Sequence, residues 1–262
     1  MLNFASICPH PPIIIPSIGQ ENLTAVTKTI KAMKELEKKL LEAKPKTLIV
    51  ISPHGPVQIG KMTIILSPAL SGDFSMFGDS TSLSFENNLA LGKIIREKNI
   101  ENNIPVDFIE NIPLDHGTLV PLYYLTKNLP NVKIIPLTFS YLDYKTHFKF
   151  GKIIGEIIKD QDKKIGVIAS GDLSHRLIPD APAGYSPRGK EFDQKLIELL
   201  EKNEVEKILN LDPDLIESAG ECGLRSVIIL LGILSSYNYE FQKLSYEGPF
   251  GVGYLVGNFR IA

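Results

Sequence analysis

The chain has 262 residues, with 28 Lys and Arg against 30 Asp and Glu, so its formal net charge is -2 with neutral histidines. This near-balance lacks the positive charge that nucleic acids and anionic membranes attract, so we expect neither as a partner. Hydrophobic residues make up 44% of the chain and charged residues 22%, which excludes a disordered protein. The only cysteines are Cys8 and Cys222, which excludes a disulfide scaffold and makes the cytoplasm the expected compartment.

The first residues do not resemble an export signal. They lack a basic segment, and proline and histidine interrupt the apolar stretch. Elsewhere no run approaches the roughly 18 apolar residues of a membrane helix. The longest apolar run covers only residues 227–234.

The first part of the chain alternates between strand and helix patterns. Leu2–Cys8 is expected to be a short buried strand. Apolar residues at helical spacing then predict a helix over 21–44, which ends before Pro45. The β-branched run Thr47–Ser52 predicts a strand covered on both faces, and a further strand is expected at 62–66.

The middle of the chain continues this alternation after a polar segment. Residues 67–84 are polar and contain glycine, so we expect a long loop. The predicted elements that follow are a helix at 85–98, a strand at 105–109, a helix at 119–128, a strand at 132–139, a helix at 143–159 and a buried strand at 165–170.

The last part of the chain predicts a loop, two helices and two strands. Residues 176–189 carry three prolines and two glycines, which indicates a loop. Helices are expected at 190–203 and 213–235, and closing strands, antiparallel to each other, at 239–246 and 253–261. No repeat or linker is visible. We therefore expect one α/β domain over 1–262, an αβα sandwich around a mixed, largely parallel sheet.

Three of the five histidines directly follow predicted buried strands. His10 follows the first strand, His54 the second buried strand and His175 the third. In open α/β sheets, ligands bind beyond the carboxyl ends of the strands. Prolines flank His10 and His54 and fix the direction of the backbone there. We therefore expect these imidazoles to converge on one site.

Converging neutral imidazoles are typical of a transition-metal site. Two histidines and one carboxylate suit non-haem Fe(II), whereas two or three histidines with a water suit catalytic zinc. The candidate carboxylates are Glu221, Asp172, Asp115 and Glu217. Glu221 is favoured because glycines on both sides interrupt a helical pattern there, although a carboxylate that stabilises a helix start has the same pattern.

The other two histidines carry weaker signals. His116 lies next to Asp115 just before a predicted helix, so it could serve the site or simply pair with that acid. His147 lies inside a predicted helix beside Phe148, and we interpret it as structural.

Five segments, taken in order, resemble the class III extradiol ring-cleavage dioxygenases of the LigB-type catalytic subunit superfamily. These segments are Cys-Pro-His-Pro-Pro-Ile, Ile-Ser-Pro-His-Gly, Leu-Asp-His-Gly-Thr-Leu-Val-Pro-Leu, Ala-Ser-Gly-Asp-Leu-Ser-His-Arg and Gly-Pro-Phe-Gly-Val-Gly-Tyr. They span nearly the whole chain. The nearest branch looks like the LigB-like proteins that accompany AMMECR1-type domains, which are also similar to Memo proteins.

The resemblance implies a mononuclear Fe(II) site with His10 and His54 as ligands and Glu221 as the third. In Memo-like proteins a cysteine occupies that third position, so Cys222 is the alternative ligand. The resemblance also implies that His175 is the active-site acid/base and that His116 is a second active-site histidine.

The activity implied by this resemblance is Fe(II)-dependent cleavage of a catecholic ring with O2. The alternative is a Memo-like metal-binding protein, with iron or copper, that acts in a redox or partner-binding role without ring cleavage. A zinc hydrolase on the same histidines is a third hypothesis. The expected partners are a small aromatic substrate, an AMMECR1-type protein and a second copy of the chain. Residues 67–84, with Phe74 and Phe77, and residues 176–189, with Tyr185, are candidate lids over the site.

Overall fold

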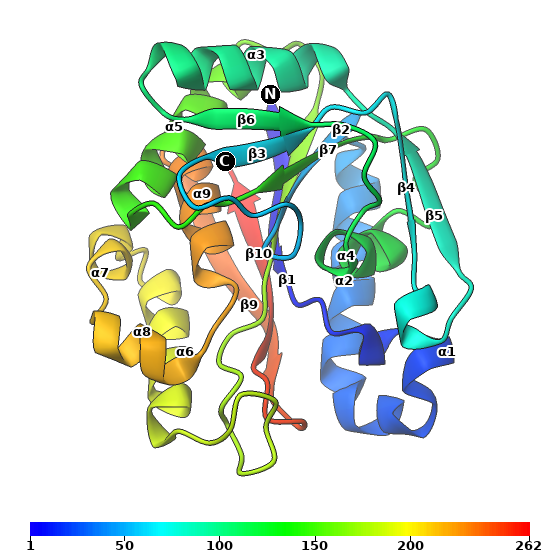
Figure 1. The fold of residues 1–262 in the computed structure, drawn as a ribbon, viewed down its shortest axis with the longest axis vertical. Helices are drawn as coiled ribbons and strands as arrows, with labels where there is room; N and C mark the ends of the chain where they lie inside the picture. Colours follow the sequence, from blue (N-terminus) through cyan, green and yellow to red (C-terminus); the bar gives the residue numbers. More distant parts are fainter.

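The computed structural model describes residues 1–262 and contains an eight-stranded sheet in the order β6-β3-β7-β2-β8-β1-β10-β9 (Figure 1). Its strands are β1 Leu2–Cys8, β2 Thr47–Ser52, β3 Met62–Ile65, β6 Val106–Ile109, β7 Lys133–Thr138, β8 Ile165–Ser170, β9 Tyr239–Glu247 and β10 Tyr254–Ile261. Two further strands, β4 Ala69–Asp73 and β5 Ser82–Glu86, form a separate hairpin.

Helices connect most of these strands. The α-helices are α1 Pro16–Gly19, α2 Thr27–Ala43, α3 Leu89–Glu101, α4 His116–Leu125, α5 Tyr144–Lys159, α6 Pro187–Glu201, α7 Val205–Leu209, α8 Pro213–Ala219 and α9 Leu224–Leu234. Short 3-10 helices cover Pro12–Ile14, Gln20–Val26 and Ser75–Phe77.

The centre of the sheet consists of four parallel strands, β7, β2, β8 and β1. Nearly all of their residues are buried because helices cover both faces, which explains why these strands are mostly apolar. Parallel order brings their carboxyl ends to one edge of the sheet. The closing strands β9 and β10 pair antiparallel, as predicted, and β10 also runs antiparallel to β1.

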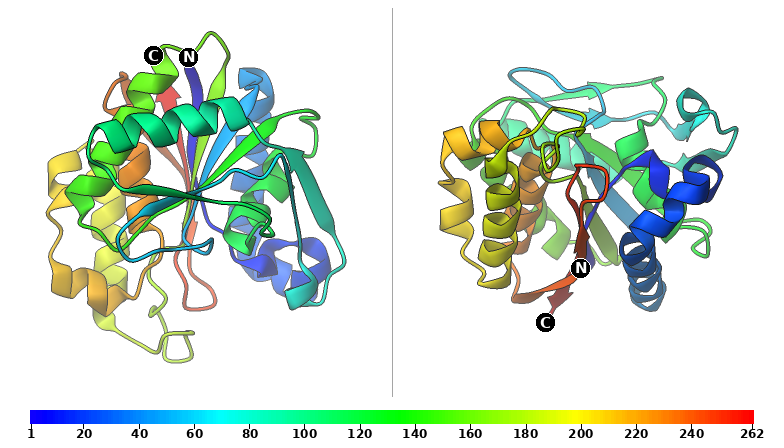
Figure 2. Two further views of the ribbon diagram at one scale, coloured as in Figure 1. Left: turned by 45° about the horizontal axis from the view of Figure 1, so that its top comes forward. Right: turned by 90° about the horizontal axis from the view of Figure 1, so that it is seen from below.

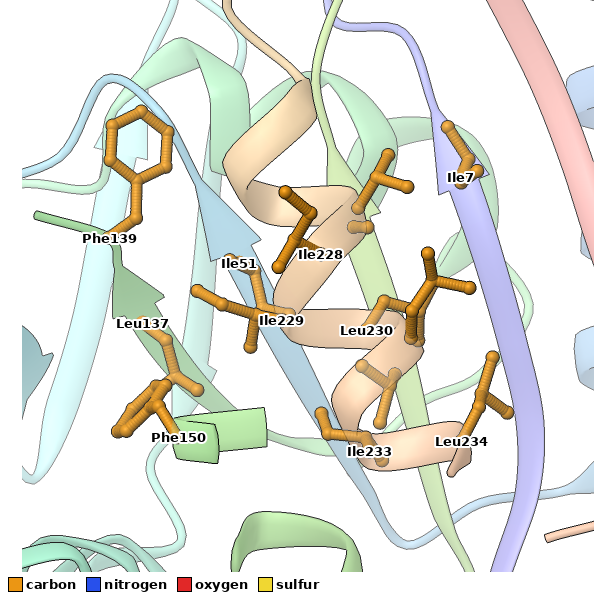
Figure 3. Close-up of a cluster of buried hydrophobic side chains, with 14 of the residues drawn as sticks. Ile7, Ile51, Leu137, Phe139, Phe150, Ile228, Ile229, Leu230, Ile233 and Leu234 are labelled. Atoms are coloured by element: carbon orange, nitrogen blue, oxygen red, sulfur yellow. The ribbon is translucent and has the colours of Figure 1, made fainter. Parts of the chain in front are cut away.

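Two hydrophobic cores lie on opposite faces of the sheet (Figure 2). The larger core, of 46 buried residues, packs the apolar helix α9 and its neighbour α5 onto the sheet. Figure 3 shows Ile229 of α9 beside Ile51 of β2, and Leu137 of β7 beside Phe150 of α5. The smaller core, of 26 buried residues, lies under α2 and α4. The αβα architecture expected from the sequence is therefore confirmed.

The predicted loop over 67–84 is wrong, because this segment contains β4, a 3-10 turn and most of β5. Alternate residues of β4 are buried, but its serine, glycine and aspartate hid the strand pattern. The helix predicted at 85–98 begins only at Leu89, where the side chain of Asn88 accepts a hydrogen bond from the Leu91 N–H. No helix in the structure is both long enough and apolar enough to span a bilayer.

The helix predicted over 213–235 is two helices, α8 and α9. Gly220 ends α8 with a positive φ of 59°, a conformation that favours glycine. The short segment between the helices carries Glu221 and Cys222 to the carboxyl edge of the sheet.

Candidate metal centre

The site is built from residues that follow adjacent parallel strands at their carboxyl ends. His10 follows β1, His54 follows β2, and Asp172 follows β8, which lies between them in the sheet. The strands therefore place all three at one edge, where the sequence pattern predicted His10 and His54 together with His175.

The side chain of His10 is held by residues after β8. The ring Nδ1 lies 3.0 Å from the Ser170 Oγ, and the backbone N–H donates to the Asp172 Oδ1 at 3.0 Å. With only 2% of His10 exposed, these contacts direct its Nε2 inward. Ser170 was not among the candidates selected from the sequence. Its position as the last residue of a predicted strand, like the positions of the histidines, could have identified it.

His54 faces His10 across the centre of the site. The two Nε2 atoms are 3.0 Å apart. The His54 backbone N–H donates to the Ser52 Oγ at 3.2 Å, and Ser52 in turn donates to the Asp115 carboxylate at 2.5 Å. Asp115 therefore supports the site from behind and does not enter it.

Cys222 offers the third possible ligand atom. Its Sγ lies 3.6 Å from the His10 Nε2, and the ligand atoms of His10, His54 and Cys222 all lie within 4.8 Å of one another. A Cβ on Gly171 would lie 2.2 Å from the Gly223 Cα, so two glycines permit this close approach of the chains. The structure thus brings these three side chains into one cluster.

Glu221 points elsewhere. Its Oε2 accepts a hydrogen bond from the Leu224 N–H at 2.6 Å, at the first residue of α9. Burial raises the pKa of this carboxyl to about 7. Its carboxylate is not part of the cluster formed by His10, His54 and Cys222, and it has the helix-start position that the sequence left open as an alternative.

The remaining candidate acids have other positions. Asp172 is buried beside His10, with its Oδ2 3.7 Å from the His10 Nε2, and burial raises its pKa to about 7. Glu217 is exposed on α8. Of the four candidate acids, therefore, only Asp172 lies beside the histidine cluster and does not cap a helix.

The imidazoles of the site favour the neutral form. Burial lowers the pKa of His54 to about 4, and burial together with the neighbouring imidazoles lowers the pKa of His10 well below its usual value. A neutral imidazole offers a lone pair to a metal. Burial and the carboxyls of Asp172 and Glu221 raise the pKa of the Cys222 thiol. A bound cation is what would offset that cost, because thiols bind metals as thiolates.

His116 and His175 lie beside this cluster. The His116 ring stacks on His54 with centroids 4.3 Å apart, and the Phe77 ring makes a T-shaped contact with His116, with centroids 5.4 Å apart. His175 is partly buried, and its Nδ1 is buried without a hydrogen-bond partner. Burial lowers the pKa of both histidines. Of the candidate lid residues, Phe77 reaches the site, whereas Phe74 is fully buried in the core and Tyr185 is exposed.

The family model described as the catalytic LigB subunit of aromatic ring-opening dioxygenase matches residues 4–257. The chain belongs to the LigB family. A crystal structure of an Escherichia coli K12 protein, JW3007, has the same fold, with a TM-score of 0.71 and 17% identity over 97% of this chain and 98% of that one.

Relatives named as dioxygenases and as MEMO1 family proteins are among those that match this chain. Protein CA_C1420 of Clostridium acetobutylicum is 35% identical over 97% of the chain, which spans only 57% of that relative's length. The 3,4-dihydroxyphenylacetate 2,3-dioxygenase of Escherichia coli is 25% identical, with 90% and 91% of the two chains covered. The MEMO1 family protein MJ0403 of Methanocaldococcus jannaschii is 30% identical over 53% of this chain and 47% of its own.

Proposed function

We propose that this LigB-family chain is a Memo-like metal protein that binds one redox-active ion, with Fe(II) as the resident metal, through His10, His54 and Cys222. The observation that carries the proposal is the convergence of two imidazoles and one thiol within 4.8 Å, while Glu221 is turned into the start of α9. The same donor set would also accept copper or zinc.

The donor set fits such an ion in charge and in softness. Two neutral imidazoles and one thiolate would supply three ligands and a single negative charge. His10 is oriented through Ser170, and His54 through Ser52 and Asp115, as outer-shell partners commonly do in metal sites. Bound Fe(II) would supply one-electron chemistry at its open coordination positions.

The neighbouring histidines support a role in moving protons beside the ion. His175 is only partly buried, and a neutral imidazole there can accept a proton from a ligand hydroxyl. His116 stacks on His54 and would form one wall of the ligand site, and Phe77 makes a T-shaped contact with His116. A small ring would therefore meet aromatic side chains and two proton carriers.

Cleavage of a catecholic ring with O2 is the second candidate function. It is favoured by the same two histidines and by the relatives named as dioxygenases. We place it second because a thiolate ligand next to O2 is itself open to oxidation, unlike the carboxylate that the sequence favoured.

Metal analysis and X-ray absorption of the purified chain test the proposal. We expect about one iron per chain with a sulfur ligand. Loss of an outer-shell partner typically weakens metal binding by roughly 10- to 100-fold. Cys222→Ser removes a ligand itself, so it should weaken Fe(II) binding by more than this. Glu221→Gln, the matched control at the neighbouring residue, should keep the metal. Normal iron binding by Cys222→Ser, together with loss of iron in Glu221→Gln, would overturn the ligand assignment.

A separate assay distinguishes the two candidate functions. The Fe(II)-loaded chain is mixed with a panel of vicinal diols under O2 and scanned for coloured ring-opened products. Absence of turnover together with a sulfur-bound metal supports the Memo-like role. Turnover of any diol that is lost in His175→Ala supports ring cleavage instead.

A further inference from the structure

The hairpin of β4 and β5 has a free strand edge that no part of the chain covers. In Figure 1 and in the left view of Figure 2 the hairpin stands apart from the main sheet, with β5 at the margin of the molecule. β5 pairs in a ladder only with β4, and it meets β7 of the main sheet only at its end, through the Glu86–Lys133 ion pair and the Asn87–Ile134 bridge.

The register of the hairpin shows which backbone groups of β5 are free. The Phe74 N–H donates to the Thr81 carbonyl, and the Asn87 N–H to the Pro68 carbonyl, so these are hydrogen-bonded pairs of the ladder. Because such pairs alternate along antiparallel strands, the N–H and C=O groups of Ser82, Ser84 and Glu86 face away from β4. None of them has a backbone or side-chain partner.

An apolar groove runs along the same strand. It has a volume of about 860 Å³. On one side it is lined by residues of the hairpin and on the other by the end of α4 and the turn before β7. Its apolar lining includes Leu70, Leu83, Phe85, Tyr123, Leu129 and Val132. The groove therefore adjoins the face of β5 that carries Leu83 and Phe85.

The edge lacks the features that normally prevent strand pairing. β5 contains neither lysine nor proline, and its outward-facing residues are two serines and one glutamate. The Glu86 carboxylate is already paired with the Lys133 ammonium at 2.9 Å. An incoming strand would therefore meet free hydrogen-bonding groups and no uncompensated charge.

We propose that a second copy of this chain docks here, with the two β5 strands pairing antiparallel about a two-fold axis at Ser84. In this register Ser84 faces its own copy, and Ser82 faces Glu86 of the partner subunit, so the two acidic residues lie at opposite ends. The same register sets Leu83 opposite Phe85 of the partner subunit on the groove face. The strand thus matches itself in hydrogen bonding, charge and apolar pattern, and this dimer does not depend on the metal site.

The test is the oligomeric state of the full chain, measured by sedimentation velocity over a concentration series. We expect a reversible dimer. Ser84→Lys and Ser84→Glu should each raise the dimer dissociation constant about tenfold or more, because each puts like charges opposite each other at the axis. Mixing the two variants should restore the dimer at low salt.

The matched control is Ser71→Lys, which changes an exposed serine directly opposite Ser84 on β4 but away from the free edge. It should dimerise normally. A wild-type chain that stays monomeric at every concentration would overturn the proposal. So would a dimer that persists in Ser84→Lys, or a failure of the two charged variants to associate on mixing.

Discussion

The capping aspartates at two helix starts are alike in sequence and geometry but differ in their surroundings. Asp115 precedes α4 and accepts hydrogen bonds from the Thr118 N–H and Oγ1 at 3.1 and 2.9 Å. Asp143 precedes α5 and accepts from the Thr146 N–H and Oγ1 at 2.9 and 2.8 Å. Only Asp115 also receives the Ser52 hydroxyl, which holds the His54 backbone. Comparing substitutions of Asp115 and Asp143 therefore distinguishes the effect of helix capping from the effect of supporting the site.

We expect Asp115→Ala and Asp143→Ala each to lower the free energy of unfolding by about 1 kcal/mol, which is the usual cost of losing an N-cap. Asp115→Ala should in addition weaken Fe(II) binding by about 10- to 100-fold, since it removes an outer-shell partner. Denaturant unfolding and metal titration of both variants check this. Equal metal affinity in the two variants would show that Asp115 acts only as a cap.

The choice between Glu221 and Cys222 shows where residue patterns stop being informative. Both lie in the segment between two glycines, and the sequence favoured the acid as ligand. The direction of each side chain depends on how the chain turns after Gly220 and on the first N–H groups of α9, one of which binds Glu221. Side-chain spacing along the sequence does not encode that turn.

The crossing of α5 and α9 depends on glycines that let two helix backbones touch. A Cβ on Gly151 would lie 2.0 Å from the Ile229 carbonyl oxygen, and one on Gly232 would lie 2.2 Å from the Phe148 carbonyl oxygen. Neither neighbour is a flexible side-chain end, so the helices would have to separate. This contact secures α9, and α9 follows directly from the segment that carries Cys222.

Gly151→Ala should therefore lower the free energy of unfolding by about 3 kcal/mol or more, despite the higher helix propensity of alanine. Gly60→Ala is the control, because no atom lies within 4 Å of the added Cβ, and it should change stability by less than about 0.5 kcal/mol. Chemical denaturation measures both. A Gly151→Ala chain as stable as wild type would mean that the helices can separate at little cost.

Elements were predictable where one residue pattern dominated. The four central strands show as mostly apolar runs because both of their faces are buried, and their ends placed His10 and His54 correctly at one edge. The hairpin of β4 and β5 was missed because its polar and glycine residues resemble a loop. Its stability comes from contacts distant in sequence, such as the Leu114 N–H that donates to the Ser71 carbonyl.

At the scale of the whole molecule, a buried histidine away from the candidate metal centre should contribute to the loss of stability in acid. His147 is completely buried, which agrees with its interpretation as a structural residue. Its Nδ1 lies 2.8 Å from the Asp143 carbonyl oxygen. Burial, followed by the Arg225 charge, lowers its pKa to about 4 against the hydrogen bonds that favour the charged form. Between pH values of about 6.5 and about 4, His147 is therefore protonated in the unfolded chain but stays neutral in the folded chain.

The sign of this effect is fixed by the lowered pKa. His147 should contribute its full stability above pH 6.5 and lose on the order of 3 kcal/mol as the pH falls to about 4. Denaturant unfolding of metal-free wild type and His147→Gln at pH 7.5 and 4.5 measures this, since glutamine does not titrate. The drop in unfolding free energy between the two pH values should be smaller in the variant, even if the variant is less stable at both. An identical drop in the two chains would mean that His147 does not contribute to the loss of stability in acid.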